Sequence, residues 1–181
     1  LMGRSANSRN RVLKSNVDFG QLHTESANVA KLQDATLTIY SAMLEKGPYF
    51  IVGNGDHTDV IARSPAPRYL NIELRRQSFE PDAPNYTPRI AAVSTLSTGR
   101  RYPYAKMTIL RKSLLGDQCD RVFYEYILSS GFGHCLTTYA SDGDPPPSFR
   151  GDPLLMPLWG DMKEVAAAYW QVLNEENRIS L

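Results

Sequence analysis

Residues 104–112 (YAKMTILRK) and 120–128 (DRVFYEYIL) decide the fold. In the first stretch Ala105, Met107 and Ile109 alternate with polar neighbours, which is the period of a half-buried strand. The second stretch is rich in β-branched and aromatic residues, which strands favour. The spacing of the two stretches is typical of an antiparallel meander.

Three further segments predict strands on either side of this pair: residues 48–56 (PYFIVGNGD), 88–96 (PRIAAVSTL) and 133–141 (GHCLTTYAS). The first is a short apolar run closed by a Gly-Asn-Gly turn, and the second is opened by a proline. The third follows a Gly-Phe-Gly turn. Strand-like segments therefore outnumber helical ones.

The clearest helix is expected within residues 160–177, GDMKEVAAAYWQVLNEEN. Asp161 can cap its start and Glu164 stands three residues later, which is a capping-box pattern. An apolar stripe follows at helical spacing, made of Val165, Tyr169 and Val172.

A second helix is expected within residues 58–76, where Pro65 and Pro67 break it into pieces. Strands in runs with helices set apart predict an α+β fold, with two stacked, mainly antiparallel sheets and helices outside. The length fits one domain, residues 1–181. We expect both ends to be cut from a larger fold, because the chain opens at Leu1 and closes on NRISL, which resembles the start of a strand.

Composition excludes several classes of partner. The formal net charge is +1, from 20 Lys and Arg against 19 Asp and Glu, so no bulk field favours nucleic acid or an anionic membrane. No apolar run approaches the roughly 20 residues that span a bilayer, and no signal-peptide pattern opens the chain. We therefore expect a cytoplasmic protein whose cysteines, Cys119 and Cys135, are reduced thiols.

The sequence also lacks the common cofactor and nucleophile motifs. There is no phosphate-binding glycine loop, dinucleotide fingerprint or G-x-S-x-G elbow. Leu1 offers no terminal nucleophile. The histidines His23, His57 and His134 match no metal-ligand spacing, and we interpret His57 and His134 as structural residues. We expect no metal and no cofactor.

Polar side chains gather where turns follow strands. Residues 54–59 (NGDHTD) combine amide, carboxylate, imidazole and hydroxyl groups, and the alternative to a site is a solvated turn. Residues 79–90 (FEPDAPNYTPRI) hold polar groups on a segment stiffened by three prolines, and the alternative is a rigid surface connector. Residues 137–144 (TTYASDGD) again lead from a strand into a glycine turn.

The opening residues 2–11, MGRSANSRNR, are either a disordered basic arm or part of an anion site. An arm that binds nucleic acid normally carries a denser run of charge on a basic chain. Here Arg4, Arg9 and Arg11 are interleaved with serine and asparagine. Guanidinium and hydroxyl donors in this mixture suit a single phosphomonoester better than a polyanion.

Several of these strings, in this order, resemble the archaeal-type IMP cyclohydrolase family and its bacterial relatives: MGRSANSRNRVL, NGDHTD, FEPDAPNYTPRIAA, GHCLTTYASDGDPPPSF and the closing YWQVLNEENRISL. The similarity covers nearly the whole chain. It implies a four-layer αββα fold like that of the N-terminal nucleophile hydrolases, without their terminal nucleophile. It also implies closure of a purine ring, in which formylated aminoimidazole carboxamide ribotide loses water to give IMP.

The resemblance also implies site residues. Tyr40, Arg11 and Glu80 match catalytic positions of the family. Substrate contacts are expected from Arg4 and Ser5 in the opening segment, from Asn54 and Asp56, and from the proline-rich segment at Tyr86, Thr87 and Arg89. The expected partner is a small purine nucleotide, together with further copies of the chain in a homo-oligomer.

Tyr40 is the expected acid–base group. A free tyrosine titrates near pH 10, and a neighbouring arginine would favour its phenolate form. The family pattern has an asparagine after this tyrosine, whereas the chain has Ser41. Two alternatives therefore stay open: a non-catalytic purine-nucleotide binding protein, and an amidohydrolase-type or ligase enzyme that acts on another nucleotide-like amide.

Overall fold

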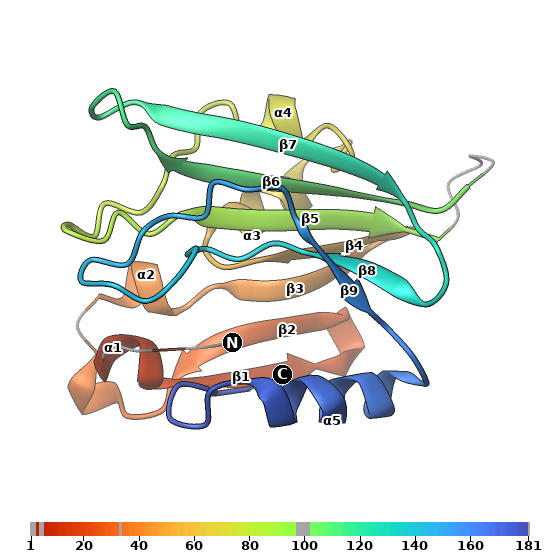
Figure 1. The fold of residues 1–181 in the computed structure, drawn as a ribbon, viewed down its shortest axis with the longest axis horizontal. Helices are drawn as coiled ribbons and strands as arrows, with labels where there is room; N and C mark the ends of the chain where they lie inside the picture. The colour runs from red at the N-terminus through yellow and green to blue at the C-terminus, as the bar shows by residue number, and fades with distance from the viewer. Residues whose placement is uncertain (1–2, 4–5, 33, 97–101, 181) are drawn as a thin grey trace.

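The fold is built on a seven-stranded antiparallel sheet (Figure 1). It is seen in a computed structural model that describes residues 3, 6–32, 34–96 and 102–180. The strands lie in the sheet in the order of the chain: β1 (Arg11–Asn16), β2 (Gln21–Ser26), β3 (Ser41–Lys46), β4 (Tyr49–Gly53), β5 (Arg89–Thr95), β6 (Tyr104–Lys112) and β7 (Cys119–Ile127). A separate two-stranded sheet pairs β8 (Phe132–Cys135) with β9 (Leu154–Pro157).

The helices are short except the last. They are α1 (Ala6–Arg9), α2 (Ala35–Thr38), α3 (His57–Arg63), α4 (Leu70–Glu73) and α5 (Met162–Val172). The side chain of Asp161 accepts hydrogen bonds from the backbone of Lys163 and Glu164, and Glu164 accepts one in return from the Asp161 backbone. The predicted capping box is confirmed. No helix in the described part of the chain is both long and apolar enough to cross a membrane.

The sheet is covered on both faces. Helices α3 and α4 pack against one face through Ile61 and Leu70, which meet Ile51 and Val93 of the sheet in a fully buried cluster. On the other face a second cluster joins Ile109 of β6 to Leu136 and Phe149, which come from the segments around β8 and β9. Adjacent residues of β6 therefore serve opposite cores, since Leu110 belongs to the first cluster.

The structure confirms an α+β fold with a large antiparallel sheet, and it places strands in the segments 48–56, 88–96, 104–112 and 120–128. The expected helix in 58–76 is present as α3 and α4, separated by the stretch that holds both prolines. The four-layer arrangement of the N-terminal nucleophile hydrolases stays a prediction.

Other expectations were wrong. The strand expected over 133–141 ends at Cys135, beyond which Tyr139 makes only an isolated bridge to Ser148. Within residues 177–180 only Arg178 makes a β-bridge, and Leu181 lies outside the described residues. The sequence pattern also missed β1, β2, β3 and β9.

The meander determines which loops meet. In an antiparallel sheet with sequential order, odd-numbered strands begin, and even-numbered strands finish, at the same end of the sheet. Here this end brings together the starts of β1, β3 and β5 and the finish of β4. It lies on the left in Figure 1, beside α1 and α2. We call it the polar end, and define it by Arg11, Tyr40, Asp56, Glu80 and Arg89.

Candidate active site

Four strands and one loop bring the residues of the polar end together. Arg11 is the first residue of β1, Tyr40 directly precedes β3, and Arg89 is the first residue of β5. Asp56 follows β4, and Glu80 lies in the loop that leads into β5. The residues expected to be catalytic therefore come from separate parts of the chain and approach one another because of the strand order.

Arg11 and Tyr40 are in direct contact. Arg11 Nη1 donates to the Tyr40 hydroxyl at 3.2 Å. The Tyr40 ring is buried, with 5% of the residue exposed. Its backbone is fixed by Thr24, whose Oγ1 accepts from the Tyr40 N–H at 3.0 Å and whose N–H donates to the Tyr40 carbonyl at 2.9 Å. The hydroxyl is therefore held by the fold and by one guanidinium.

The charge state of Tyr40 differs from the expectation. Burial raises the pKa of the Tyr40 hydroxyl above its ordinary value, and the nearby Glu80 adds to the increase. Arg11 acts in the expected direction and lowers the pKa, but it does not outweigh the burial. Tyr40 is therefore a protonated hydroxyl at neutral pH and a hydrogen-bond donor, not a phenolate base.

Glu80 has a strongly perturbed carboxyl group. The residue is 7% exposed, and burial raises the pKa of Glu80 to about 7, with a further increase from the carboxylates of Asp82 and Asp56. Arg89 and Arg11 oppose this rise. A carboxyl group that titrates near neutral pH can both accept and return a proton, which is the property required of a general acid–base group.

Arg89 is held at the entrance to β5. Its Nη1 lies 2.8 Å from Asp56 Oδ1 and donates to Gln77 Oε1 at 3.2 Å. The Arg89 side chain is largely buried, whereas the Asp56 side chain is 55% exposed. Asp56 therefore forms the solvent-facing side of the polar end and keeps the guanidinium oriented.

The side chain of Asn54, a predicted substrate contact, is already hydrogen-bonded within the protein. Asn54 Nδ2 donates to the Pro88 carbonyl at 2.9 Å, and Asn54 Oδ1 accepts from the Ile90 N–H at 2.8 Å. The amide therefore joins the end of β4 to the start of β5. Its role in binding substrate stays a prediction.

The proline-rich loop is organised by Asp82, a residue that the sequence did not single out as a site. Its carboxylate accepts from the Thr87 N–H at 2.7 Å and from the Thr87 hydroxyl, which also contacts the Tyr139 hydroxyl at 2.7 Å. Tyr86 has a positive φ of 44°, and its ring lies 3.6 Å from Lys112 Nζ. Thr87 and Tyr86 are thus engaged within the protein.

The opening segment is part of the fold from residue 6 onward, as α1 and then β1. Arg9 donates from Nε to the Gly3 carbonyl at 3.2 Å and from Nη2 to Asn177 Oδ1 at 2.9 Å. The disordered-arm alternative is therefore wrong for residues 6–11. Arg4 and Ser5 lie outside the described residues.

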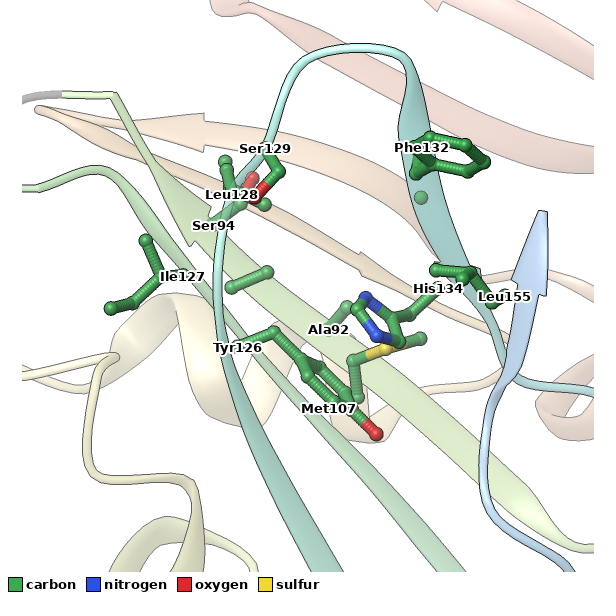
Figure 2. Close-up of a pocket in the computed structure, with 12 residues that line it drawn as sticks. Ala92, Ser94, Met107, Tyr126, Ile127, Leu128, Ser129, Phe132, His134 and Leu155 are labelled. Atoms are coloured by element: carbon green, nitrogen blue, oxygen red, sulfur yellow. The ribbon is translucent and has the colours of Figure 1, made fainter. Parts of the chain in front are cut away.

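A pocket of about 480 Å³ lies elsewhere, on the face of β5, β6 and β7 that β8 and β9 cover. Figure 2 shows its lining, in which the ring of His134 stacks on Tyr126 with centroids 3.5 Å apart and an interplanar angle of 11°. Most of the other lining side chains are apolar. We call this cavity the apolar pocket, and none of the predicted site residues lines it.

Two buried guanidinium nitrogens are left over at the polar end. Arg11 Nε and Arg89 Nε are both buried without a hydrogen-bond partner in the described part of the chain. No group of three or more His, Cys, Asp or Glu side chains that could hold a metal ion occurs among the residues described. The chemistry available at the polar end is therefore that of two arginines, a tyrosine and carboxyl groups.

A family model described as IMP cyclohydrolase-like protein matches residues 1–181, the full length of the chain. The sequence matches no curated protein.

Proposed function

Because the chain belongs to the IMP cyclohydrolase-like family, we propose that it closes the ring of formylated aminoimidazole carboxamide ribotide to give IMP and water, in purine biosynthesis in the cytoplasm. The observation that carries the proposal is that Arg11, Tyr40 and Glu80 lie together at the polar end. Arg11 is hydrogen-bonded to Tyr40, and burial raises the pKa of Glu80 to about 7.

The reaction requires two groups of one substrate to be held together and a proton to be moved. The carboxamide nitrogen attacks the formyl carbon, and the formyl oxygen gains negative charge. Groups held at reacting distance need little further ordering, which lowers the barrier. No redox step and no covalent enzyme intermediate is needed.

We assign the proton transfer to Glu80. In its carboxylate form it accepts a proton from the attacking carboxamide nitrogen and then returns it to the oxygen of the carbinolamine. The second proton of the departing water comes from the neighbouring formamide nitrogen. A group with a pKa of about 7 is suited to both directions of transfer at neutral pH.

We assign stabilisation of the developing oxyanion to Tyr40 and Arg11. The Tyr40 hydroxyl accepts from Arg11 and keeps its own proton free to donate to the substrate oxygen. The guanidinium charge lies directly behind this donor. A preorganised donor in a buried site stabilises charge more strongly than water does. Arg89, oriented by Asp56, supplies a second cation on the substrate side.

The test is to incubate the protein with the formylated ribotide and follow the absorbance of IMP, with and without a metal chelator. Turnover that survives the chelator is expected. Binding of the ribotide without turnover would instead indicate a nucleotide-binding protein that lacks the activity. Absence of both would indicate an enzyme for another nucleotide-like amide.

A further inference from the structure

His57 carries a buried nitrogen that the proposed chemistry does not use. The residue begins α3 and is fully buried. His57 Nε2 lies 2.9 Å from the Ile90 carbonyl oxygen, and because a carbonyl only accepts, Nε2 carries the ring proton. Burial lowers the pKa of the ring to about 4, so His57 is neutral at neutral pH and its Nδ1 is an acceptor.

This acceptor lacks a donor. His57 Nδ1 is buried and has no hydrogen-bond partner among the residues that the structure describes. Leaving a buried polar atom unpaired destabilises a protein, so such atoms are uncommon in folded proteins. The question is which neighbouring group could donate to it.

Gly55 identifies the group that faces His57. A Cβ atom placed on Gly55 would lie 3.2 Å from His57 Nδ1 and 3.5 Å from Glu80 Oε1. Both atoms therefore border the same small space beside the Gly55 Cα. Gly55 is itself buried, so this space is inside the protein. A methyl group at residue 55 would contact both atoms and occupy this space.

The carboxyl group of Glu80 also lacks a hydrogen-bond partner among the residues described. With a pKa of about 7, Glu80 carries its proton on a large fraction of molecules at neutral pH. Asp82 and Asp56 favour that protonated form, whereas Arg89 and Arg11 favour the carboxylate. A protonated carboxyl is a strong donor, and His57 Nδ1 is an acceptor without a donor.

We propose that His57 is a positioning residue for Glu80, whose protonated carboxyl group donates to His57 Nδ1 across the space beside Gly55. This hydrogen bond exists only when Glu80 is protonated, so it orients the proton and favours the acid form that must return it to the substrate. The role in catalysis rests on the proposed function, whereas the hydrogen bond itself does not.

The first test uses the free wild-type protein and needs no substrate. The ¹⁵N resonance of His57 Nδ1 should shift with a midpoint near pH 7, where Glu80 titrates, while the ring stays in its Nε2–H form throughout. The shift should be absent in Glu80→Gln. An Nδ1 resonance that stays constant from about pH 5.5 to 8.5 in the wild-type protein would overturn the proposal.

Two variants separate the hydrogen bond from packing. Gly55→Ala keeps the His57 ring but fills the space beside His57 Nδ1 and Glu80 Oε1 with a methyl group, so the ¹⁵N shift should be lost. His57→Leu removes the acceptor, and the pKa of Glu80, read from its carboxyl ¹³C resonance, should fall by about one unit. His57→Gln retains an acceptor oxygen and should recover part of this change. Equal values in the Leu and Gln variants would contradict the proposal.

The activity readout is a double-mutant comparison. If His57 acts through Glu80, His57→Leu should lower kcat and move the pH profile in the wild-type background, and should have little further effect on kcat in Glu80→Gln. Equal effects in both backgrounds would show a merely structural role. Absence of turnover in every form would count against the proposed function alone, because the resonance tests do not depend on it.

Discussion

The polar end and the apolar pocket differ in the side chains that they contain. The polar end holds a buried tyrosine, a buried carboxyl group and two arginines whose Nε atoms have no hydrogen-bond partner among the described residues, all within loops and strand ends. The apolar pocket encloses about 480 Å³, and its polar side chains are largely a stacked His–Tyr pair and two serines. The polar end therefore carries the ionisable groups, whereas the cavity is lined mainly by apolar side chains.

This difference is the reason why we propose the polar end, and not the cavity, as the reaction site. Burying ionisable groups costs free energy, and a protein retains such groups where their perturbed protonation is useful. The pKa of Glu80 and the Arg11–Tyr40 contact meet this criterion. The apolar pocket has no comparable set of charges, so we expect substitutions there to leave catalysis intact.

The largest expected effect is that of Glu80→Gln. Glutamine keeps the shape of the side chain but cannot take up and return a proton, so kcat should fall about 10²–10⁴-fold with little change in KM. The limb of the wild-type pH profile with a pKa of about 7 should disappear. Steady-state kinetics across pH measure both effects. An unchanged kcat in Glu80→Gln would show that the reaction does not take place at the polar end.

Tyr40→Phe should have the next largest effect. The ring and its packing are kept, but the donor to the oxyanion is lost and Arg11 Nη1 loses its acceptor. Removal of one such donor typically lowers kcat about 10²–10³-fold. Because Glu80 remains, the pH limb near 7 should persist in this variant. Near wild-type kcat would mean that Tyr40 serves packing only.

The third prediction concerns stability and the sign of its pH dependence. Glu80 has a raised folded-state pKa, so its stabilising contribution is present below the unfolded value near 4.5 and is lost as pH rises through about 7. His57 has a lowered pKa, so its contribution is present above 6.5 and is lost as pH falls through about 4.

These two contributions oppose each other where their ranges overlap. The wild-type free energy of unfolding should therefore change little across that range, whereas Glu80→Gln should become more stable as pH rises from about 4 to 6.5. Urea denaturation at several pH values measures this difference. Parallel pH curves for the two proteins would contradict the assignment of the raised pKa to Glu80.

The smallest effect is expected in the apolar pocket. His134→Ala removes the stack on Tyr126 and should lower the free energy of unfolding by about 1 kcal/mol, in addition to the lost packing. Its kcat should stay close to that of the wild-type protein. Thermal unfolding and kinetics on the same sample provide the test. A large loss of kcat would show that the two regions act together.

Local pattern was sufficient for the central strands and for α5. The alternation in 104–112 and the capping box at Asp161 and Glu164 are properties of neighbouring residues, which the sequence displays directly. Strands β1 to β3 were missed because RVLKSN, QLHTES and SAMLEK carry many polar residues and only weak alternation. Their pairing in the sheet, rather than their own composition, makes them strands.

The site residues were found through family resemblance, not through spacing. Nothing local in the sequence links Arg11 to Tyr40 or to Glu80, since their approach depends on the order of strands in the sheet. The direction of the Tyr40 pKa was predicted incorrectly because burial is a property of the folded chain. The orphan nitrogen of His57 was likewise invisible, because a histidine beside a turn looks the same whether or not its ring is satisfied.

The position of β1 at the margin of the seven-stranded sheet has a consequence for how the site opens. An edge strand is held by one neighbour, whereas β5 is held by two, and local opening is easiest where fewest bonds must break. Backbone amides of β1 should therefore exchange with deuterated solvent well before those of β5. Because Arg11 is the first residue of β1, it would leave and rejoin the site whenever this strand opens locally. Arg89 would stay in place, because β5 opens more rarely. The protein would thus hold Arg11 on an edge strand that exchanges fast and Arg89 on a central strand that exchanges slowly.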